Sequence, residues 1–277
     1  MLNLAFEMKL AYYIKDFRLE SDPGVLGLLS ELRAAGFEAE PATCPEELDG
    51  SVGMLLSFGG DGTYLSAAAI ARKAGLPVLG VNFGRLGFLS ENRPEDVVAA
   101  LLHKDYSIQN RGMVKTWGWD GCTEPEYALN EICVLRRGAA MLGIDVEVDS
   151  RPLPTYWADG LLVATSSGST AYSLSAGGPI CLPESRVLIV SPVAPHNLNV
   201  RPLVVPDTAD IRISFRSRDS LVRLTADNRS FDIASDAVLH ACAVPESLQR
   251  VVLGGSNFIE ALRTRLLWGD DVRNVSK

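Results

Sequence analysis

The sequence predicts two domains: an α/β domain built on a parallel sheet, followed by a β-rich, mainly antiparallel domain. In the first part of the chain, short apolar runs alternate with helix-like segments, as a parallel sheet with crossover helices requires. From about residue 112, apolar and polar residues alternate, which is typical of half-buried antiparallel strands. The 277 residues suffice for two domains of ordinary size. We therefore expect an α/β domain over residues 1–111, completed by a returning segment over 256–277, and a β-rich domain over 112–255.

The elements of the α/β domain follow from apolar runs and from helix start and stop signals. A helix begins after Ser21 or Asp22, has Pro23 in its first turn and ends at Gly36. An Ala-rich helix begins at Thr63, and another helix carries acidic residues in its first turn. The Ala-rich helix is expected over 63–74 and the helix with the acidic first turn over 94–103. The expected strands of this domain span 8–14, 52–58 and 77–81.

The β-rich domain is expected to consist of short alternating strands with turn residues between them. Asp227-Asn228 joins two of these strands as a hairpin, because Asn tolerates the left-handed conformation of tight turns. Apolar residues at helical spacing over 257–268 predict a C-terminal helix that returns to the first domain. The expected strands span 144–148, 211–215, 221–225 and 231–233.

Composition excludes several classes of protein. The net charge of −8 argues against a general affinity for nucleic acid or anionic membrane, since both depend on dense basic patches. No apolar run approaches the roughly 18 residues that span a bilayer. Glu7 and Lys9 interrupt the apolar N-terminus, so we expect no secretion signal and a cytoplasmic protein. The five widely spaced cysteines contain no CxxC pair, and we interpret them as buried reduced thiols.

The stretch VGMLLSFGGDGT places one acid between glycines, directly after a buried strand and directly before a helix. Gly59, Gly60 and Gly62 let the main chain turn sharply and bring N–H groups against an anion, and the helix at Thr63 adds its positive end. Taken alone, such a run is often just a turn. Its place at the carboxyl end of a parallel sheet favours a phosphate site, and the carboxylate of Asp61 there suggests chemistry or a metal.

A second glycine-containing loop follows the next strand of the α/β domain. Arg85 lies between Gly84 and Gly87 and is a candidate phosphate ligand, although a solvated loop arginine is an equal alternative. The basic residues are mostly Arg, which binds oxyanions bidentately.

Residues 156–180 form another dense stretch, in which hydroxyl and small residues precede a predicted helix. The SSGST run can cap that helix and offer donors to a ligand, and Tyr172 can either stack on a base or pack in the core. Asn130-Glu131 interrupts an apolar strand, and such a pair is usually a solvent-facing edge or a bulge. The capping residues in question are Ser167, Gly168, Ser169 and Thr170.

Five motifs in this order resemble the NAD kinase family: GGDGT at 59–63, Asn130-Glu131, Asp159-Gly160, GSTAYSLSAGGP at 168–179 and PHNLNVRPLVVP at 195–206. The resemblance implies an N-terminal α/β domain packed on an all-β domain, with the nucleotide between them. It implies phosphorylation of the 2′-hydroxyl of the adenosine ribose of NAD to give NADP, with ATP or sometimes polyphosphate as donor. A divalent metal, Mg²⁺ by preference, and self-association as a homodimer or homotetramer are also expected by resemblance.

The resemblance also implies roles for single residues. Asp61 accepts the proton of the 2′-hydroxyl, while amides of the glycine loop and the metal bear the phosphoryl charge. No metal ligands are assigned. The expected phosphate-binding residues are Gly59, Gly60, Thr63 and Arg85, and the expected NAD-binding residues are Gly62, Asn130, Glu131, Asp159, Ser167, Thr170, Ala171, Tyr172, Ser173, Leu174 and Ser175.

Two departures from the family pattern stand out. The family often shows Thr-Pro-Thr or Thr-Pro-Ser where this chain has TSS at residues 165–167. The family's usual turn after Asp carries a Gly or Ser and often a Gln, whereas here Asp227 is followed by Asn228-Arg229. Two rival functions stay open: a lipid kinase of the diacylglycerol or sphingosine type, which shares a GGDGT-type loop, and a non-catalytic NAD or NADP sensor. The acidic pI argues against the first and the presence of Asp61 against the second.

Overall fold

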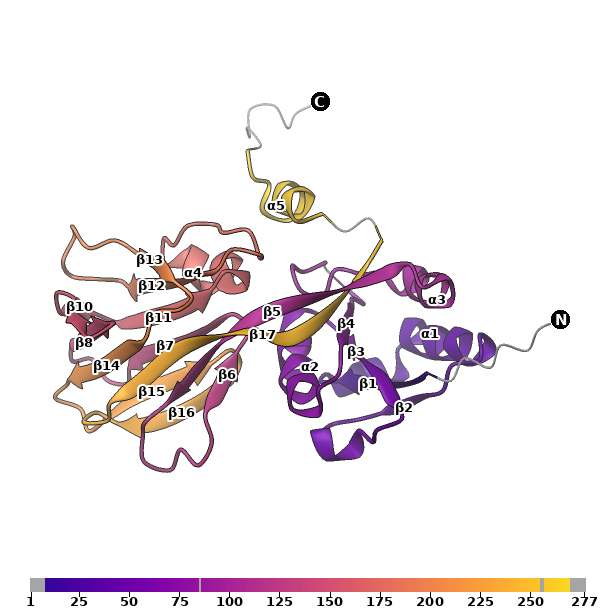
Figure 1. Cartoon of the computed structure of the whole chain (residues 1–277), viewed down its shortest axis with the longest axis horizontal. Helices are drawn as coiled ribbons and strands as arrows, with labels where there is room; N and C mark the ends of the chain where they lie inside the picture. The colour runs from indigo at the N-terminus through magenta and orange to yellow at the C-terminus, as the bar shows by residue number, and fades with distance from the viewer. Residues whose placement is uncertain (1–7, 85, 255–256, 270–277) are drawn as a thin grey trace. The chain divides into compact units, whose positions relative to one another are not determined.

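The computed structural model describes residues 8–84, 86–254 and 257–269, and the chain divides into two compact units (Figure 1). Unit 1 comprises Met1–Gln109 and Leu248–Lys277, and unit 2 comprises Asn110–Ser247. Two long strands, β5 (Tyr106–Trp117) and β17 (Leu239–Leu253), each begin in one unit and end in the other. Each unit is described by itself below.

Unit 1 is built on a parallel sheet in the order β2-β1-β3-β4, with the end of β17 added beside β4 in parallel. Strand β3 is mostly apolar and almost entirely buried, because a central parallel strand has both faces covered. The strands are β1 (Lys9–Ile14), β2 (Ala39–Pro41), β3 (Val52–Phe58) and β4 (Val78–Val81).

The helices of unit 1 begin and end at recognisable signals. In α1, Asp22 is the N-cap and accepts the N–H of Gly24 at 2.8 Å, with Pro23 at the first helical position. Helix α2 begins at Asp61, two residues before its predicted start, with Gly60 as N-cap. The helical segments are η1 (Phe17–Ser21), α1 (Pro23–Ala34), η2 (Pro45–Glu47), α2 (Asp61–Ala74), α3 (Pro94–His103) and α5 (Phe258–Leu266).

Unit 2 contains antiparallel strands in two groups. One group has the order β10-β8-β14-β17, with β9 beside β8, and the other has the order β13-β12-β11-β7-β15-β16; β6 pairs with β5. The bounds are β6 (Glu126–Ala128), β7 (Glu131–Arg136), β8 (Leu142–Val148), β9 (Arg151–Pro152), β10 (Tyr156–Ala158), β11 (Gly160–Thr165), η3 (Ser167–Thr170), α4 (Tyr172–Ser175), β12 (Val187–Val193), β13 (Leu203–Pro206), β14 (Ile211–Arg216), β15 (Leu221–Ala226) and β16 (Arg229–Ala234).

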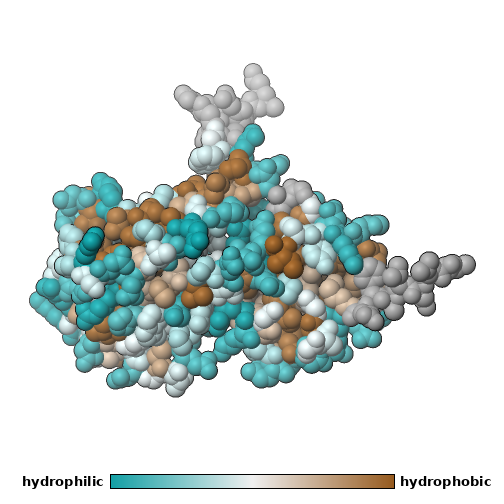
Figure 2. Space-filling model, viewed as in Figure 1, coloured by the Kyte–Doolittle hydropathy of each residue, from teal (hydrophilic) through white to brown (hydrophobic). Residues whose placement is uncertain are grey.

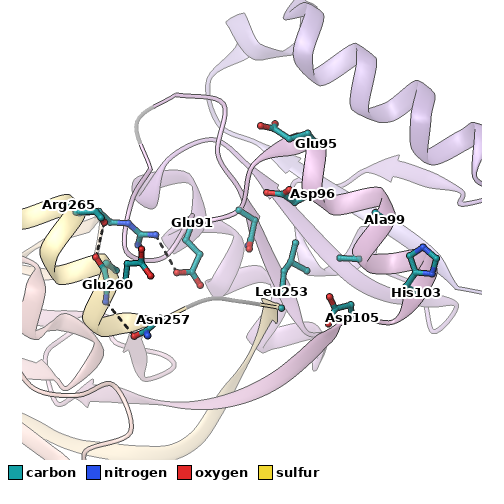
Figure 3. Close-up of a pocket in the computed structure, with 15 residues that line it drawn as sticks. Glu91, Glu95, Asp96, Ala99, His103, Asp105, Leu253, Asn257, Glu260 and Arg265 are labelled. Atoms are coloured by element: carbon teal, nitrogen blue, oxygen red, sulfur yellow. Dashed lines mark hydrogen bonds and ion pairs between the residues drawn. The ribbon is translucent and has the colours of Figure 1, made fainter.

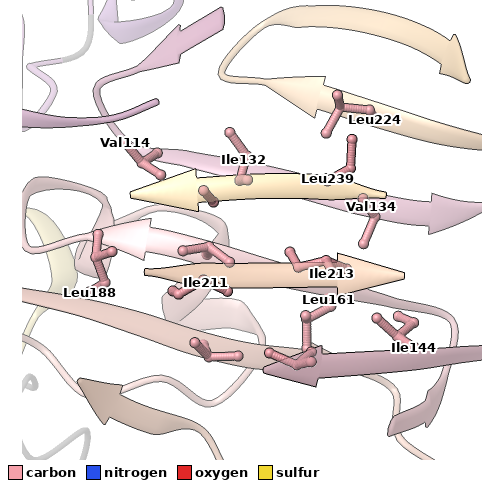
Figure 4. Packing of buried hydrophobic residues seen from close by; sticks show 14 of the residues in the cluster. Val114, Ile132, Val134, Ile144, Leu161, Leu188, Ile211, Ile213, Leu224 and Leu239 are labelled. Atoms are coloured by element: carbon pink, nitrogen blue, oxygen red, sulfur yellow. The ribbon is translucent and has the colours of Figure 1, made fainter. Parts of the chain in front are cut away.

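A single apolar core holds these strands together. Figure 4 shows alternate residues of neighbouring strands meeting in it, among them Val134, Ile144, Leu161, Ile213 and Leu224. Each of these side chains is at most 1 % exposed, so each contributes roughly 1.5–3 kcal/mol of burial free energy. The period-two pattern that predicted the strands is therefore the pattern of this core.

The predicted fold class is confirmed: a parallel α/β layer, an antiparallel β-rich part and a C-terminal helix. The hairpin joins β15 to β16, but Asp227 (φ +51°) adopts the left-handed conformation that we expected of Asn228. All five cysteines are free, as expected, but Cys133 alone among them is buried. No helix in the described ranges has the length and apolarity to span a membrane. On the face shown in Figure 2, hydrophobic residues form separate patches.

Candidate functional site

The predicted phosphate loop of unit 1 lies at the carboxyl end of β3, as expected. Gly59 has φ +144°, and a Cβ there would lie 2.5 Å from the Thr63 hydroxyl oxygen, so this turn requires glycine. Gly60 and Gly62 are exposed, and no atom lies within 4 Å of where their Cβ atoms would be. No side chain caps α2, so its first turn is open to an anion. Arg85 lies outside the described residues.

Asp61 is held by the neighbouring loop that follows β4. Its Oδ1 accepts the N–H groups of Leu89 at 3.1 Å and Ser90 at 2.9 Å, and its Oδ2 accepts the N–H of Phe88 at 2.9 Å. A Cβ on Gly87 would lie 1.9 Å from Asp61 Oδ1, so only glycine permits this approach. We name residues 87–91 the clasp loop. In the sequence, Gly87 stands out only as a glycine flanking Arg85, whereas the structure uses it for close contact with Asp61.

The predicted residues of unit 2 form a second cluster around Asn130 and Glu131. The Asn130 carbonyl accepts the N–H of Thr165 at 2.8 Å, and a Cβ on Gly168 would lie 2.1 Å from that carbonyl oxygen. The Glu131 carboxyl accepts the N–H of Tyr172. The Asn130-Glu131 pair and the SSGST segment are thus packed together, and Asn130 is buried instead of lying on a solvent-facing edge.

Asp227 holds this cluster from the β15–β16 turn. Its carboxylate accepts the N–H groups of Leu129 at 2.7 Å, Asn130 at 2.8 Å and Glu131 at 3.3 Å. Sequence reasoning treated Asp227 only as a turn residue, because contacts between positions 97 residues apart leave no periodic signal. Arg229, whose role was open, donates to Glu126 at 3.1 Å and to the carbonyl of Tyr127.

The environment of Glu131 favours its protonated form. Burial, followed by the charge of Asp227, raises the pKa of Glu131 to about 8, and the Tyr172 N–H opposes this only in part. Glu131 Oε2 is buried and accepts or donates no hydrogen bond among the described residues. At neutral pH the group is therefore mainly a carboxylic acid, able to donate as well as accept.

The remaining predicted residues surround this pair. Asp159 forms an ion pair with Arg136 at 2.6 Å, and burial, followed by nearby acidic groups that include Asp159, raises the pKa of Tyr172. Tyr172 is 39 % exposed, so its ring does not belong to the core and can meet a ligand.

The SSGST segment differs from the expected capped helix. It forms a 3-10 turn followed by one helical turn, and neither N-cap residue bonds to its turn through a side chain; the Thr165 hydroxyl instead accepts the N–H of Gly168 at 3.1 Å. Ser169 instead exchanges hydrogen bonds with the main chain of Cys181, and Ser173 is fully buried. Partly or fully exposed positions that can face a ligand are Ser167, Thr170, Ala171, Tyr172, Leu174 and Ser175.

Family models match both parts of the chain. The ATP-NAD kinase N-terminal domain matches residues 19–105, and the ATP-NAD kinase C-terminal domain matches residues 129–253. The chain is 39 % identical to the NAD kinase of Flavobacterium psychrophilum over 236 residues, covering 83 % of this chain and 80 % of that protein. It is 37 % identical to the NAD kinase of Porphyromonas gingivalis W83 over 274 residues, covering 98 % and 89 %.

Solved structures share the fold. An NAD kinase from Archaeoglobus fulgidus in complex with ATP matches with a TM-score of 0.73 and 28 % identity, covering 95 % of this chain and 97 % of that one. Yeast NADH kinase complexed with NADH matches with a TM-score of 0.82 and 22 % identity, covering 98 % and 91 %.

Proposed function

The chain belongs to the NAD kinase family, and we propose that it transfers the terminal phosphoryl group of ATP to the 2′-hydroxyl of the adenosine ribose of NAD, giving NADP. The observation that carries the proposal is the pair of clusters described above. One is a glycine loop with a held carboxylate, suited to phosphoryl transfer, and the other is a polar cluster suited to a nucleotide. Both lie within the segments matched by the family models.

Asp61 is the proposed proton acceptor. A carboxylate has about four acceptor positions, and the clasp loop uses two on Oδ1 and one on Oδ2. One position on Oδ2 is thus left for the proton of the attacking hydroxyl. A base fixed by three main-chain donors needs little reorganisation, and a positioned base contributes typically about 10² to 10⁴ in rate.

The phosphate loop is the proposed cradle for the transferring phosphoryl group. The exposed main chain of Gly60 and Gly62 and the positive end of α2 support binding of the donor phosphates, with Gly59 and Thr63 shaping the turn. Amides that are already in place stabilise charge as it develops on the phosphoryl oxygens.

The cluster around Glu131 is the proposed NAD site. Glu131 in its acid form can donate to one ribose hydroxyl oxygen while accepting from another, and the buried, unused Oε2 supports such a ligand contact. Asp159, oriented by Arg136, offers a further acceptor, and Tyr172 offers an exposed ring for stacking.

We propose Mg²⁺ as the divalent metal. The described residues contain no group of three or more His, Cys, Asp or Glu side chains placed to bind a metal. Mg²⁺ commonly binds one or two carboxylates together with substrate phosphates, so we expect it to arrive on ATP. When bound, it would offset phosphoryl charge.

The test is product formation by the purified chain. We expect NADP from ATP, Mg²⁺ and NAD, with polyphosphate as a second donor arm and diacylglycerol or sphingosine as alternative acceptors. Phospholipid without NADP would support the lipid kinase instead, and tight NAD binding without turnover would support a sensor. No NADP with either donor would refute the proposal.

Asp61→Asn tests the proposed base directly. We expect turnover to fall at least about 10²-fold while NAD binding stays measurable, because the amide keeps a similar shape but cannot accept the proton. Isothermal titration with NAD and initial-rate kinetics separate the two effects. An unchanged turnover number would remove Asp61 from this role.

A cytoplasmic location and self-association into dimers or tetramers are further proposals. The first rests on the interrupted apolar N-terminus and the second on the family resemblance of the sequence. Analytical ultracentrifugation of the full chain tests the second.

A further inference from the structure

The clasp loop is held on a second side by residues that the proposed reaction does not use. Arg250, near the end of β17, donates to the carbonyl oxygen of Phe88 at 3.2 Å and to Glu91 Oε1 at 2.5 Å. Arg265 of helix α5 lies 3.5 Å from the other oxygen of the same carboxylate, Oε2. Figure 3 shows the Arg265 side chain reaching from α5 toward Glu91. The carboxylate of Glu91 therefore joins two arginines that come from different elements of unit 1.

The same helix also contacts the ring of Phe88. The ring of Phe258, in the first turn of α5, lies 6.1 Å from the Phe88 ring between centroids. The guanidinium of Arg265, in the last turn, lies 5.5 Å from the Phe88 centroid, within cation–π range. Both ends of α5 thus touch one side chain of the clasp loop.

Phe88 connects these contacts to Asp61 through its own main chain. Its N–H donates to Asp61 Oδ2, its carbonyl accepts from Arg250, and its ring meets α5. A shift of the Phe88 main chain therefore disturbs one of the three hydrogen bonds that hold the Asp61 carboxylate. Displacement of about 1 Å at a catalytic group can cost about 10²-fold in rate, so this linkage bears on turnover.

The charged groups of this linkage are well shielded from water. The side chains of Glu91, Arg250 and Arg265 are 8 %, 10 % and 17 % exposed. Ion pairs at such positions are screened little by solvent, and removal of one partner leaves an uncompensated charge. Loss of Arg265 still leaves Glu91 paired with Arg250, so the chain should fold while the clasp loop loses its brace from α5.

We propose that Arg265 is a positioning residue for Asp61 and acts through Glu91 and Phe88, so that helix α5 braces the clasp loop. The part that concerns turnover rests on the proposed function of Asp61; the bracing of the loop does not. Arg265 touches neither substrate nor the reacting atoms in this scheme, and its effect is confined to the placement of the carboxylate.

The experiment compares Arg265→Ala with Arg263→Ala, an exposed arginine two residues away on the same helix. Amide hydrogen exchange of residues 86–91 is measured by mass spectrometry on the full chain, because the N–H groups of Phe88–Ser90 are those that Asp61 binds. We expect amide exchange in Arg265→Ala to be at least about tenfold faster than in wild type. In Arg263→Ala, we expect the exchange rate to equal that of wild type.

Kinetics supply the second readout. We expect kcat to fall about tenfold in Arg265→Ala with the KM for NAD within about twofold of wild type, since all the expected NAD residues except Gly62 lie in the other unit. Arg265→Lys keeps the charge near Glu91 but loses the planar guanidinium over Phe88, so its kcat should be intermediate. Arg263→Ala should match wild type in both constants.

The outcomes separate the two proposals. Unchanged exchange at Phe88–Ser90 in Arg265→Ala overturns the brace, whatever the activity. Equal losses in Arg265→Ala and Arg263→Ala overturn it as well, because the effect would then belong to the helix in general. Absence of NADP from the wild type would refute the proposed function, yet faster exchange in Arg265→Ala alone would still support the brace.

Discussion

Glu131→Gln should make the chain more stable, and increasingly so as the pH rises from 5 to 8. In the folded chain, burial and the charge of Asp227 raise the pKa of Glu131 from 4.5 to about 8. Between these values the unfolded chain has released the proton that the folded chain keeps. Raising the pH therefore favours unfolding, and the amide of the variant, which cannot ionise, removes that dependence.

The magnitude follows from the linkage of proton binding to folding. A group that is protonated only in the folded state changes the free energy of unfolding by about 1.4 kcal/mol per pH unit. Glu131 thus costs the wild type at most about 3 kcal/mol between pH 5 and pH 7, and little below pH 5. Glutamine is nearly isosteric and, like the carboxylic acid, carries one donor group and one acceptor, so the fold around it should be preserved.

The assay is urea unfolding of wild type and Glu131→Gln at pH 5, 6, 7 and 8. Glu124→Gln, at an exposed glutamate of the same unit, is the matched control and should show no such trend. A difference between wild type and Glu131→Gln that stays constant over this range would refute the reasoning. In kinetics, the variant should chiefly raise the apparent constant for NAD, and a pure turnover defect would contradict the assignment of Glu131 to binding.

Three glycine substitutions test close approaches described above. Gly87→Ala should lower turnover by about 10²-fold with NAD binding retained, because its Cβ would lie 1.9 Å from Asp61 Oδ1. If the variant instead had wild-type kinetics, the clasp loop would have to adjust to the new side chain. Gly168→Ala should weaken NAD binding, measured by calorimetry, because its Cβ would lie 2.1 Å from the Asn130 carbonyl oxygen. An unchanged affinity for NAD would contradict that contact. Gly27→Ala, in the middle of α1 with no atom within 4 Å, should instead raise the free energy of unfolding by up to about 1 kcal/mol and leave both constants unchanged.

Sequence patterns predict the parts of this protein whose cause is local. The mostly apolar run 52–58 predicted a buried strand, and the glycines after it predicted the sharp turn that Gly59 makes. The start signal of α1 worked for the same reason, as Asp22 caps the helix that follows it. In these places the residue and its effect lie within one turn of each other.

Contacts between distant segments were not predictable in this way. Phe88 bonds to Asp61, 27 residues away along the chain, and Asp227 bonds to Asn130, 97 residues away. The periodicity of apolar residues carries no information about contacts at such sequence separations. The SSGST segment was expected to be capped by its own side chains, but Ser169 bonds to Cys181 instead. Tertiary partners thus replaced the local ones, and the residues that hold the proposed functional groups were missed for that reason.

The division of unit 1 along the chain has a consequence for biosynthesis. Its first segment ends at Gln109, and its second begins at Leu248, after the whole of unit 2. Domains tend to fold in the order in which the ribosome makes them, so the nascent chain can complete unit 2 while unit 1 still lacks one parallel strand and α5. Arg250 and Arg265 emerge last. A chain that ends before α5 would hold the Glu131 cluster without the proposed brace on the clasp loop, and we expect its turnover to be lowered for that reason.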